Sequence, residues 1–156
     1  MGRIEQRLAE LGLQLPSVVP PLAAYIPAVV SGNLVFTSGQ LPMTDGALPE
    51  TGKVGLGDGF VDPERAKQYA QTCALNALAA VENAIGDLDR VVRVVKVVGF
   101  VSSSPDFTGA PGVVNGASEL LGSVFGDAGV HARSAVGVAV LPLDYPVEVE
   151  LIVEFA

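Results

Sequence analysis

Two charged side chains in the last quarter of the sequence are of types, and at a spacing, that could do chemistry. Arg133 opens an otherwise uncharged, strand-like run at residues 132–140, and Glu148 lies in a second run at residues 147–155. A guanidinium at the mouth of an apolar hairpin is costly to desolvate unless an anion meets it, and a small carboxylate ligand is one candidate. Glu148 could orient and deprotonate a water molecule.

Each of these residues also has a plainer interpretation. Arg133 could cap a sheet edge or pair with an acidic neighbour, and Glu148 could belong with Glu150 and Glu154 to a solvated strand face. His131 is the only histidine, and it lacks an acid partner and a serine at a known spacing. These features favour a surface or hinge role for His131 over a catalytic one.

The composition narrows the class of protein. The chain has 156 residues, of which 49% are hydrophobic and 6% aromatic, so its core must be built from Val, Leu and Ala. A chain of this length buries about 70% of its unfolded surface, and we expect one domain over residues 1–156. The net charge of −8 with nine Lys and Arg residues argues against a nucleic-acid partner, because phosphate binding needs basic side chains.

The numbers of cysteine and histidine residues limit the disulfides and metal sites that the chain can form. One cysteine and one histidine allow neither an intrachain disulfide nor a zinc site of the Cys/His type within one chain, and we expect no metal or cofactor. The N-terminus lacks the apolar core of a signal peptide. The longest apolar stretch, at 91–101, is interrupted by Arg93 and Lys96 and is too short to cross a bilayer. A cytoplasmic location without a membrane partner fits best.

Hydrophobic periodicity predicts an α+β sandwich in which two long helices pack on one face of a mixed sheet. Asp62 and Pro63 predict a helix start, because an aspartate caps well and proline suits the first helical position. Gly86 predicts its end. One stripe of this helix consists of mostly small residues, which would let it lie close to a sheet: Ala66, Ala70, Cys73, Ala77, Val81 and Ile85. The β-branched run at 91–101 is apolar on both faces, which indicates a central strand covered twice. The predicted elements are a short helix at 3–12, strands at 28–30 and 34–37, a short strand near 53–55, a helix from 62 to 86, a strand at 91–101, a helix at 113–125 and strands at 132–140 and 147–155.

The last two strands are predicted to form a hairpin that turns at residues 143–144. In that register Arg133 pairs near Glu154 and Glu148 pairs near Ala139. Arg133 and Glu148 then lie six positions apart along the ribbon, about 20 Å at ~3.3 Å per residue. They could not share a ligand within one chain, and we expect them to meet across a subunit interface.

Three blocks of sequence resemble the RidA/YjgF family of reactive-intermediate deaminases, also known as L-PSP endoribonucleases. The first is Tyr25 with the run from Gly32 to Pro42, which contains Ser38-Gly39-Gln40. The second is the segment 76–101 with Ser104-Pro105-Asp106-Phe107 and Asn115 beyond it. The third is Ala132-Arg133-Ser134 through Leu141-Pro142 to Val147-Glu148-Val149-Glu150.

The resemblance implies a chorismate-mutase-like fold, a homotrimer with ligand clefts between subunits, and hydrolysis of 2-imino and 2-enamino acids to 2-oxo acids and ammonia without a cofactor. Arg133 matches the family's carboxylate-binding arginine, and Glu148 matches the glutamate that holds the attacking water. The remaining matches are Tyr25 as an aromatic lid, Gly39 as a backbone contact, Asn115 as a polar wall residue and Ala135 as a backbone N–H donor.

Two other functions stay open at this point. A non-catalytic regulatory trimer that binds a small carboxylate would need the arginine but not Glu148. Endoribonuclease activity, which the family name carries, is the weakest alternative because the chain is acidic and its sequence shows no basic patch.

Overall fold

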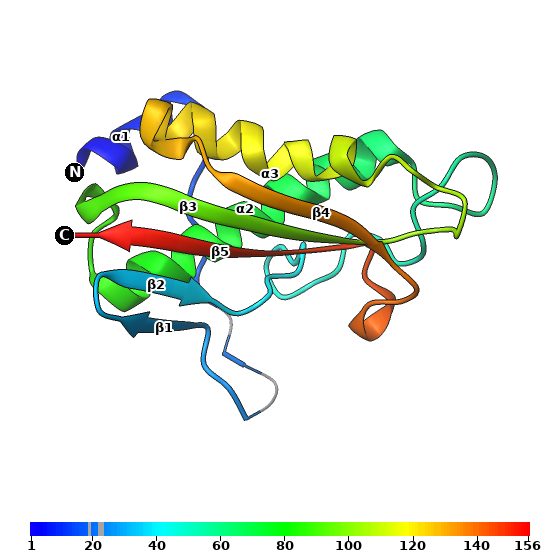
Figure 1. The fold of residues 1–156 in the computed structure, drawn as a ribbon, viewed down its shortest axis with the longest axis horizontal. Coiled ribbons are helices and arrows are strands. Elements are labelled where there is room, and N and C mark those ends of the chain that lie inside the picture. The colour runs from blue at the N-terminus through cyan, green and yellow to red at the C-terminus, as the bar shows by residue number, and fades with distance from the viewer. Residues whose placement is uncertain (19, 22–23) are drawn as a thin grey trace.

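The computed structural model describes residues 1–18, 20–21 and 24–156, which form a five-stranded mixed sheet with helices on one side (Figure 1). The predicted α+β class is confirmed. The elements are α1 (Arg3–Glu10), β1 (Ala28–Ser31), β2 (Leu34–Thr37), α2 (Pro63–Ile85), β3 (Val91–Ser102), α3 (Ala110–Phe125), β4 (Ala132–Val138) and β5 (Val147–Phe155).

The order of the strands differs from the prediction at the C-terminal end. The sheet runs β1-β2-β5-β3-β4, with β3 parallel to β4 and antiparallel to β5. The hairpin predicted for residues 132–155 is therefore wrong, because β3 lies between its two strands. Residues 139–146 instead carry the chain past the end of β3, where the Ser102 amide donates to the Pro146 carbonyl over 2.9 Å.

The insertion of β3 has a physical reason. Its twelve residues gain backbone partners along both edges, which satisfies donors and acceptors that the apolar interior would otherwise leave unpaired. Parallel strands need a long crossover connection, and α3 supplies it between β3 and β4. The prolines at 142 and 146 suit a hairpin turn and a longer crossing equally well, so the sequence did not distinguish the two.

The predicted signals at the ends of α2 are confirmed. The Asp62 carboxylate accepts from the backbone N–H groups of Glu64 at 3.1 Å and Arg65 at 3.2 Å, and Pro63 occupies the first turn. Gly86 ends the helix with a φ of 86°, a left-handed conformation that glycine adopts without strain.

Small residues let the helices approach the sheet and each other closely. The predicted stripe of α2 is buried; its members are Ala66, Ala70, Cys73, Ala77, Val81 and Ile85. On α3, a Cβ added at Gly116 would overlap the Lys67 carbonyl of α2. A Cβ added at Gly99 of β3 would overlap Val114 of α3. These contacts fix α3 against both α2 and the sheet.

Two boundaries differ from the prediction. Helix α3 begins at Ala110 rather than at Val113, because Pro111 suits the first turn of a helix. Val54 makes only isolated bridges, to Val61 and Ser103, where a short strand was predicted near 53–55. Among the residues that the structure describes, no helix combines the length and the apolar character needed to span a membrane.

The sheet face turned away from the helices, here called the open face, carries partly exposed apolar side chains beside Lys96 of β3 and the glutamates of β5. Its apolar side chains include Phe36, Val98, Phe100, Val136 and Ile152. Phe36 is 41% exposed and Val136 is 45% exposed. The prediction that β3 is covered on both faces therefore holds for only one face within the described part of a single chain.

The close contact between α2 and α3 predicts a large effect of one methyl group. Gly116→Ala should lower the free energy of unfolding by about 1–3 kcal/mol or more, because the helices must move apart. Gly122→Ala on the same helix meets nothing within 4 Å and should leave stability unchanged or raise it by up to about 1 kcal/mol. Chemical denaturation of both variants measures the difference. Equal stabilities would contradict this account of the helix contact.

Candidate functional site

The six predicted site residues fall into two groups of three in the folded chain. The first group is Arg133 and Ala135 on β4 with Asn115 on α3. Arg133 Nη1 donates to Asn115 Oδ1 over 2.7 Å, and Nη2 donates to the Pro111 carbonyl over 3.3 Å. The structure thus places Asn115, which the family resemblance assigns to the wall of the site, directly beside Arg133.

The strand register explains why Arg133 reaches α3. Arg133 pairs with Val97, which is fully buried beneath the helices, so both side chains lie on the helix side of the sheet. Ala135 lies two residues along β4, opposite Gly99, and therefore on the same face. Since β4 is an edge strand, the guanidinium lies half-buried at the border of the core rather than inside it.

The second group is Glu148 on β5 with Gly39 and Tyr25. A Cβ added at Gly39 would overlap the Glu148 carboxylate, so this glycine allows the loop to lie directly against the side chain. Gln40 holds the loop there by a pair of backbone hydrogen bonds with Val149, at 2.8 and 3.0 Å. The sequence predicted Gly39 as a backbone contact, and the structure places it against the predicted glutamate.

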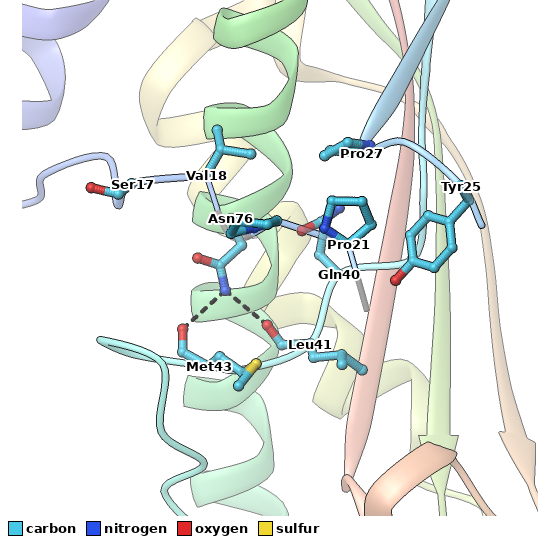
Figure 2. Close-up of a pocket in the computed structure, with 11 residues that line it drawn as sticks. Ser17, Val18, Pro21, Tyr25, Pro27, Gln40, Leu41, Met43 and Asn76 are labelled. Carbon is cyan, nitrogen blue, oxygen red and sulfur yellow. Dashed lines mark hydrogen bonds between the residues drawn. The ribbon is translucent and has the colours of Figure 1, made fainter. Parts of the chain in front are cut away.

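Tyr25 and Gly39 line the same pocket, which lies between α2 and the segment that contains Pro20, Pro21 and Pro27 (Figure 2). The pocket holds about 600 Å³ of empty space, part of it open to solvent. Asn76 of α2 fixes one wall by donating to the Leu41 carbonyl at 2.8 Å and the Met43 carbonyl at 3.1 Å, as Figure 2 shows. Tyr25 is 51% exposed at the rim. Neither Arg133 nor Glu148 lines this pocket.

The side chains of Arg133 and Glu148 lie on opposite faces of the sheet. Glu148 pairs with Phe100, whereas Arg133 pairs with Val97, three residues earlier on β3. Side chains alternate between faces, so an odd separation places Glu148 on the open face and Arg133 on the helix side. Their Cα atoms are separated by about three residues and two strand spacings, or about 14 Å. The expectation that they cannot share a ligand within one chain stands, but for a different reason than the hairpin.

The charges of Arg133 and Glu148 are not neutralised by ion pairs within the described residues. Arg133 has neutral hydrogen-bond partners in Asn115, Pro111 and Ser118. Burial raises the pKa of the Glu148 carboxyl, and repulsion from Glu150 raises that pKa further. Within the part of the chain that the structure describes, Arg133 is therefore a cation without an anionic partner, and Glu148 is a base without a cationic partner.

Two residues near Arg133 were not predicted for the site. Ser118 accepts a hydrogen bond from Arg133 Nη1 over 3.3 Å, and its Oγ lies 2.8 Å from Nε2 of His131. For Ser118 the signal in the sequence was its spacing from residues 111 and 115. Residues three or four positions apart lie on one face of a helix. Among the described residues, no group of three or more His, Cys, Asp and Glu side chains could hold a metal ion.

The raised pKa predicts how Glu148 affects stability. Between the unfolded and folded pKa values the folded chain binds more protons, so the free energy of unfolding falls as the pH rises through this window. Glu148→Gln should remove the part of this decrease in the free energy of unfolding that the titration of Glu148 causes. Glu150→Gln should lower the pKa of Glu148, because one source of repulsion is gone. Carbon-13 NMR titration of the carboxyl groups measures both effects. A Glu148 pKa at or below the ordinary glutamate value in the unliganded protein would contradict the burial argument.

Comparisons with known proteins agree with the fold. The family model described as "YjgF/chorismate_mutase-like, putative endoribonuclease" matches residues 5–155. Protein TCP17 of Trypanosoma cruzi is 46% identical over 154 residues, covering 98% of this chain and 94% of that protein. The crystal structure of Atu1372 from Agrobacterium tumefaciens, a protein of unknown function, is 47% identical with a TM-score of 0.90 and covers 99% of this chain and 93% of its own.

A more distant structure has a ligand. The crystal structure of Escherichia coli TdcF with bound serine has a TM-score of 0.65 at 23% identity, covering 89% of this chain and 94% of its own. That likeness concerns the fold alone. The match of the family model over almost the whole chain shows that this protein belongs to the YjgF/chorismate mutase-like family.

Proposed function

We propose that this protein hydrolyses small 2-imino and 2-enamino acids to 2-oxo acids and ammonia in a cleft between subunits. The observation that carries the proposal is that two charged groups, Arg133 and Glu148, have no ion-pair partner among the described residues of one chain. Among residues 1–18, 20–21 and 24–156, Arg133 is an oriented cation without an anion and Glu148 is a partly desolvated base without a cation, and the two lie on opposite faces of one sheet.

Arg133 is suited to bind the substrate carboxylate. Its guanidinium is held by the Asn115 amide oxygen and a backbone carbonyl, neither of which cancels its charge. A bidentate pair with a carboxylate is charge-assisted and fixes the orientation of a small planar substrate. This positioning removes part of the entropic barrier to attack at the neighbouring carbon. The backbone N–H of Ala135, two residues along β4, is the further contact that the family resemblance assigns.

Glu148 is suited to act as the general base. A raised pKa makes its carboxylate a stronger proton acceptor at neutral pH. Glu148 takes a proton from water as the oxygen forms a bond to the carbon of the protonated imine, and the C=N electron pair moves to the nitrogen to give a neutral carbinolamine. Glu148 then gives this proton to the amine nitrogen. As the C–N bond breaks and the carbonyl forms, Glu148 takes the hydroxyl proton, which leaves with the ammonia as ammonium. Gly39 packs against this base, and Tyr25, which lines a pocket with Gly39, is the aromatic lid that the family resemblance assigns.

A homotrimer would complete the site. The open face offers apolar side chains that one chain leaves partly exposed, among them Phe36 at 41% and Val136 at 45%. A closed ring of identical subunits can bury this face and bring β4 of one copy beside Glu148 of the next. TdcF, which shares the fold, holds serine, a small amino acid with a carboxylate.

The family description also mentions endoribonuclease activity. The chain has a net charge of −8, and the half-site around Arg133 contains one cation, which favours a single carboxylate over a phosphate backbone. RNA cleavage that survives Arg133→Ala would come from a site other than this one or from a contaminant.

The first test is ammonia release from 2-iminopropanoate. Arg133→Ala should lower kcat/KM by about 100-fold or more, because a charge-assisted bidentate contact is lost. Glu148→Gln should lower kcat by about 100-fold or more, because the general base is lost. A wild-type protein that binds pyruvate but hydrolyses no imine would instead favour a non-catalytic regulatory protein. Equal rates of ammonia release by the wild type and Arg133→Ala would contradict the proposed deaminase function.

The second test asks whether two subunits share each site. Arg133→Ala and Glu148→Gln trimers are unfolded, mixed in equal amounts and refolded together. If Arg133 and Glu148 come from different subunits, each mixed trimer regains one intact site of three, and the mixture regains about one quarter of the wild-type activity. If both residues come from the same subunit, no activity returns. Sedimentation velocity of the same samples checks that trimers form.

A further inference from the structure

The contacts of Arg133 continue beyond the residues that the family resemblance assigns. Ser118 of α3 lies between Arg133 Nη1, at 3.3 Å, and His131 Nε2, at 2.8 Å. The other ring nitrogen of His131, Nδ1, lies 2.6 Å from the Gly129 carbonyl. A Cβ added at Gly129 would overlap the Leu121 carbonyl, so the backbone at Gly129 is packed tightly against α3. The series therefore ends on a fixed backbone position.

The direction of each hydrogen bond follows from the chemistry of its partners. The Gly129 carbonyl can only accept, so Nδ1 of His131 carries the proton. In the neutral imidazole Nε2 is then an acceptor, and the Ser118 hydroxyl donates a hydrogen bond to it. The Ser118 oxygen keeps a lone pair for Arg133 Nη1. Three donors thus point the same way, from the guanidinium to the backbone, and each bond polarises the next.

This arrangement decides which edge of the guanidinium is available. The two hydrogens of Nη1 are directed to Asn115 and Ser118, and Nη2 donates one hydrogen to the Pro111 carbonyl. Nε has no hydrogen-bond partner within the described part of the chain. The Nε–H group and the second hydrogen of Nη2 are parallel neighbours, and they match the two oxygens of a carboxylate.

We propose that Ser118 and His131 are positioning residues for Arg133 and that they present its Nε–Nη2 edge to the substrate carboxylate. The proposal deepens the proposed function and rests on it. Ser118 holds Nη1 directly, whereas His131 acts through Ser118 by fixing the direction of its hydroxyl. Without either side chain the guanidinium can rotate, and its two free hydrogens no longer face the ligand together.

The test measures pyruvate binding by calorimetry and steady-state kinetics with 2-iminopropanoate. Ser118→Ala and His131→Leu should each weaken pyruvate binding about five-fold, the effect of one ordinary hydrogen bond. KM should rise by a similar factor while kcat changes little, because the carboxylate contact is common to the bound substrate and the transition state. Ser118→Thr and His131→Gln keep a hydroxyl and an acceptor at these positions and should restore most of the affinity.

Ser123→Ala is the matched control, because Ser123 is an exposed serine on the same helix and makes no side-chain contact with Arg133. Wild-type pyruvate affinity in Ser118→Ala or His131→Leu, alongside a large loss in Arg133→Ala, would overturn the positioning role and leave the proposed function intact. Failure of Arg133→Ala to weaken binding would instead count against the proposed function.

A structural measurement keeps the inference testable if no imine or pyruvate binds. Crystal structures of the wild type and Ser118→Ala, both without ligand, should show the Arg133 guanidinium rotated or spread over several conformers in the variant only. An unchanged guanidinium in Ser118→Ala would show that Asn115 and Pro111 position it without help, and the inference would be wrong.

Discussion

The placement of β3 between β4 and β5 is the constraint on which the rest of this structure depends. Because both neighbours are in fixed register with β3, each residue on them is assigned to one face of the sheet. Arg133 and Glu148 are separated by an odd number of β3 residues and so lie on opposite faces. A one-residue slip in either pairing would expose the core side chains of that strand, so hydrophobic burial also fixes where the charged groups lie.

The environment of each charged group is consistent with a site that is half-built in one chain. Removing a charged group from water is unfavourable unless hydrogen bonds or an opposite charge compensate. Arg133 receives that compensation from neutral oxygens, so it stays oriented while its charge remains available to a ligand. Glu148 receives less compensation, because Gly39 packs against it and Glu150 repels it. In the proposed trimer, the interface between subunits would bring these opposite charges into one cleft.

Close packing positions the groups that surround Arg133 and Glu148. The alanine-rich face of α2 and the glycines of α3 and β3 allow the helices to lie near the sheet. That closeness puts Asn115 and Ser118 within hydrogen-bond distance of Arg133. On the other side, Gly39 lets its loop approach Glu148 more closely than any residue with a side chain could. Small residues thus determine the geometry of groups that are far apart in the sequence.

The sequence by itself determined the local structure of the chain and the identity of the charged groups. The cap at Asp62, the left-handed Gly86 and the small-residue stripe of α2 depend on neighbouring residues, and the structure confirms them. The family motifs also identified Arg133 and Asn115, which the structure joins by a hydrogen bond.

Only the tertiary structure decided the strand order, the two faces of the sheet and the link from Arg133 through Ser118 to His131. These features depend on contacts between residues distant in sequence. The turn chemistry of residues 141–146 fits a hairpin as well as a crossing past β3, so local preference could not choose between them. The choice was made by the burial of β3 and the pairing of its backbone on both edges.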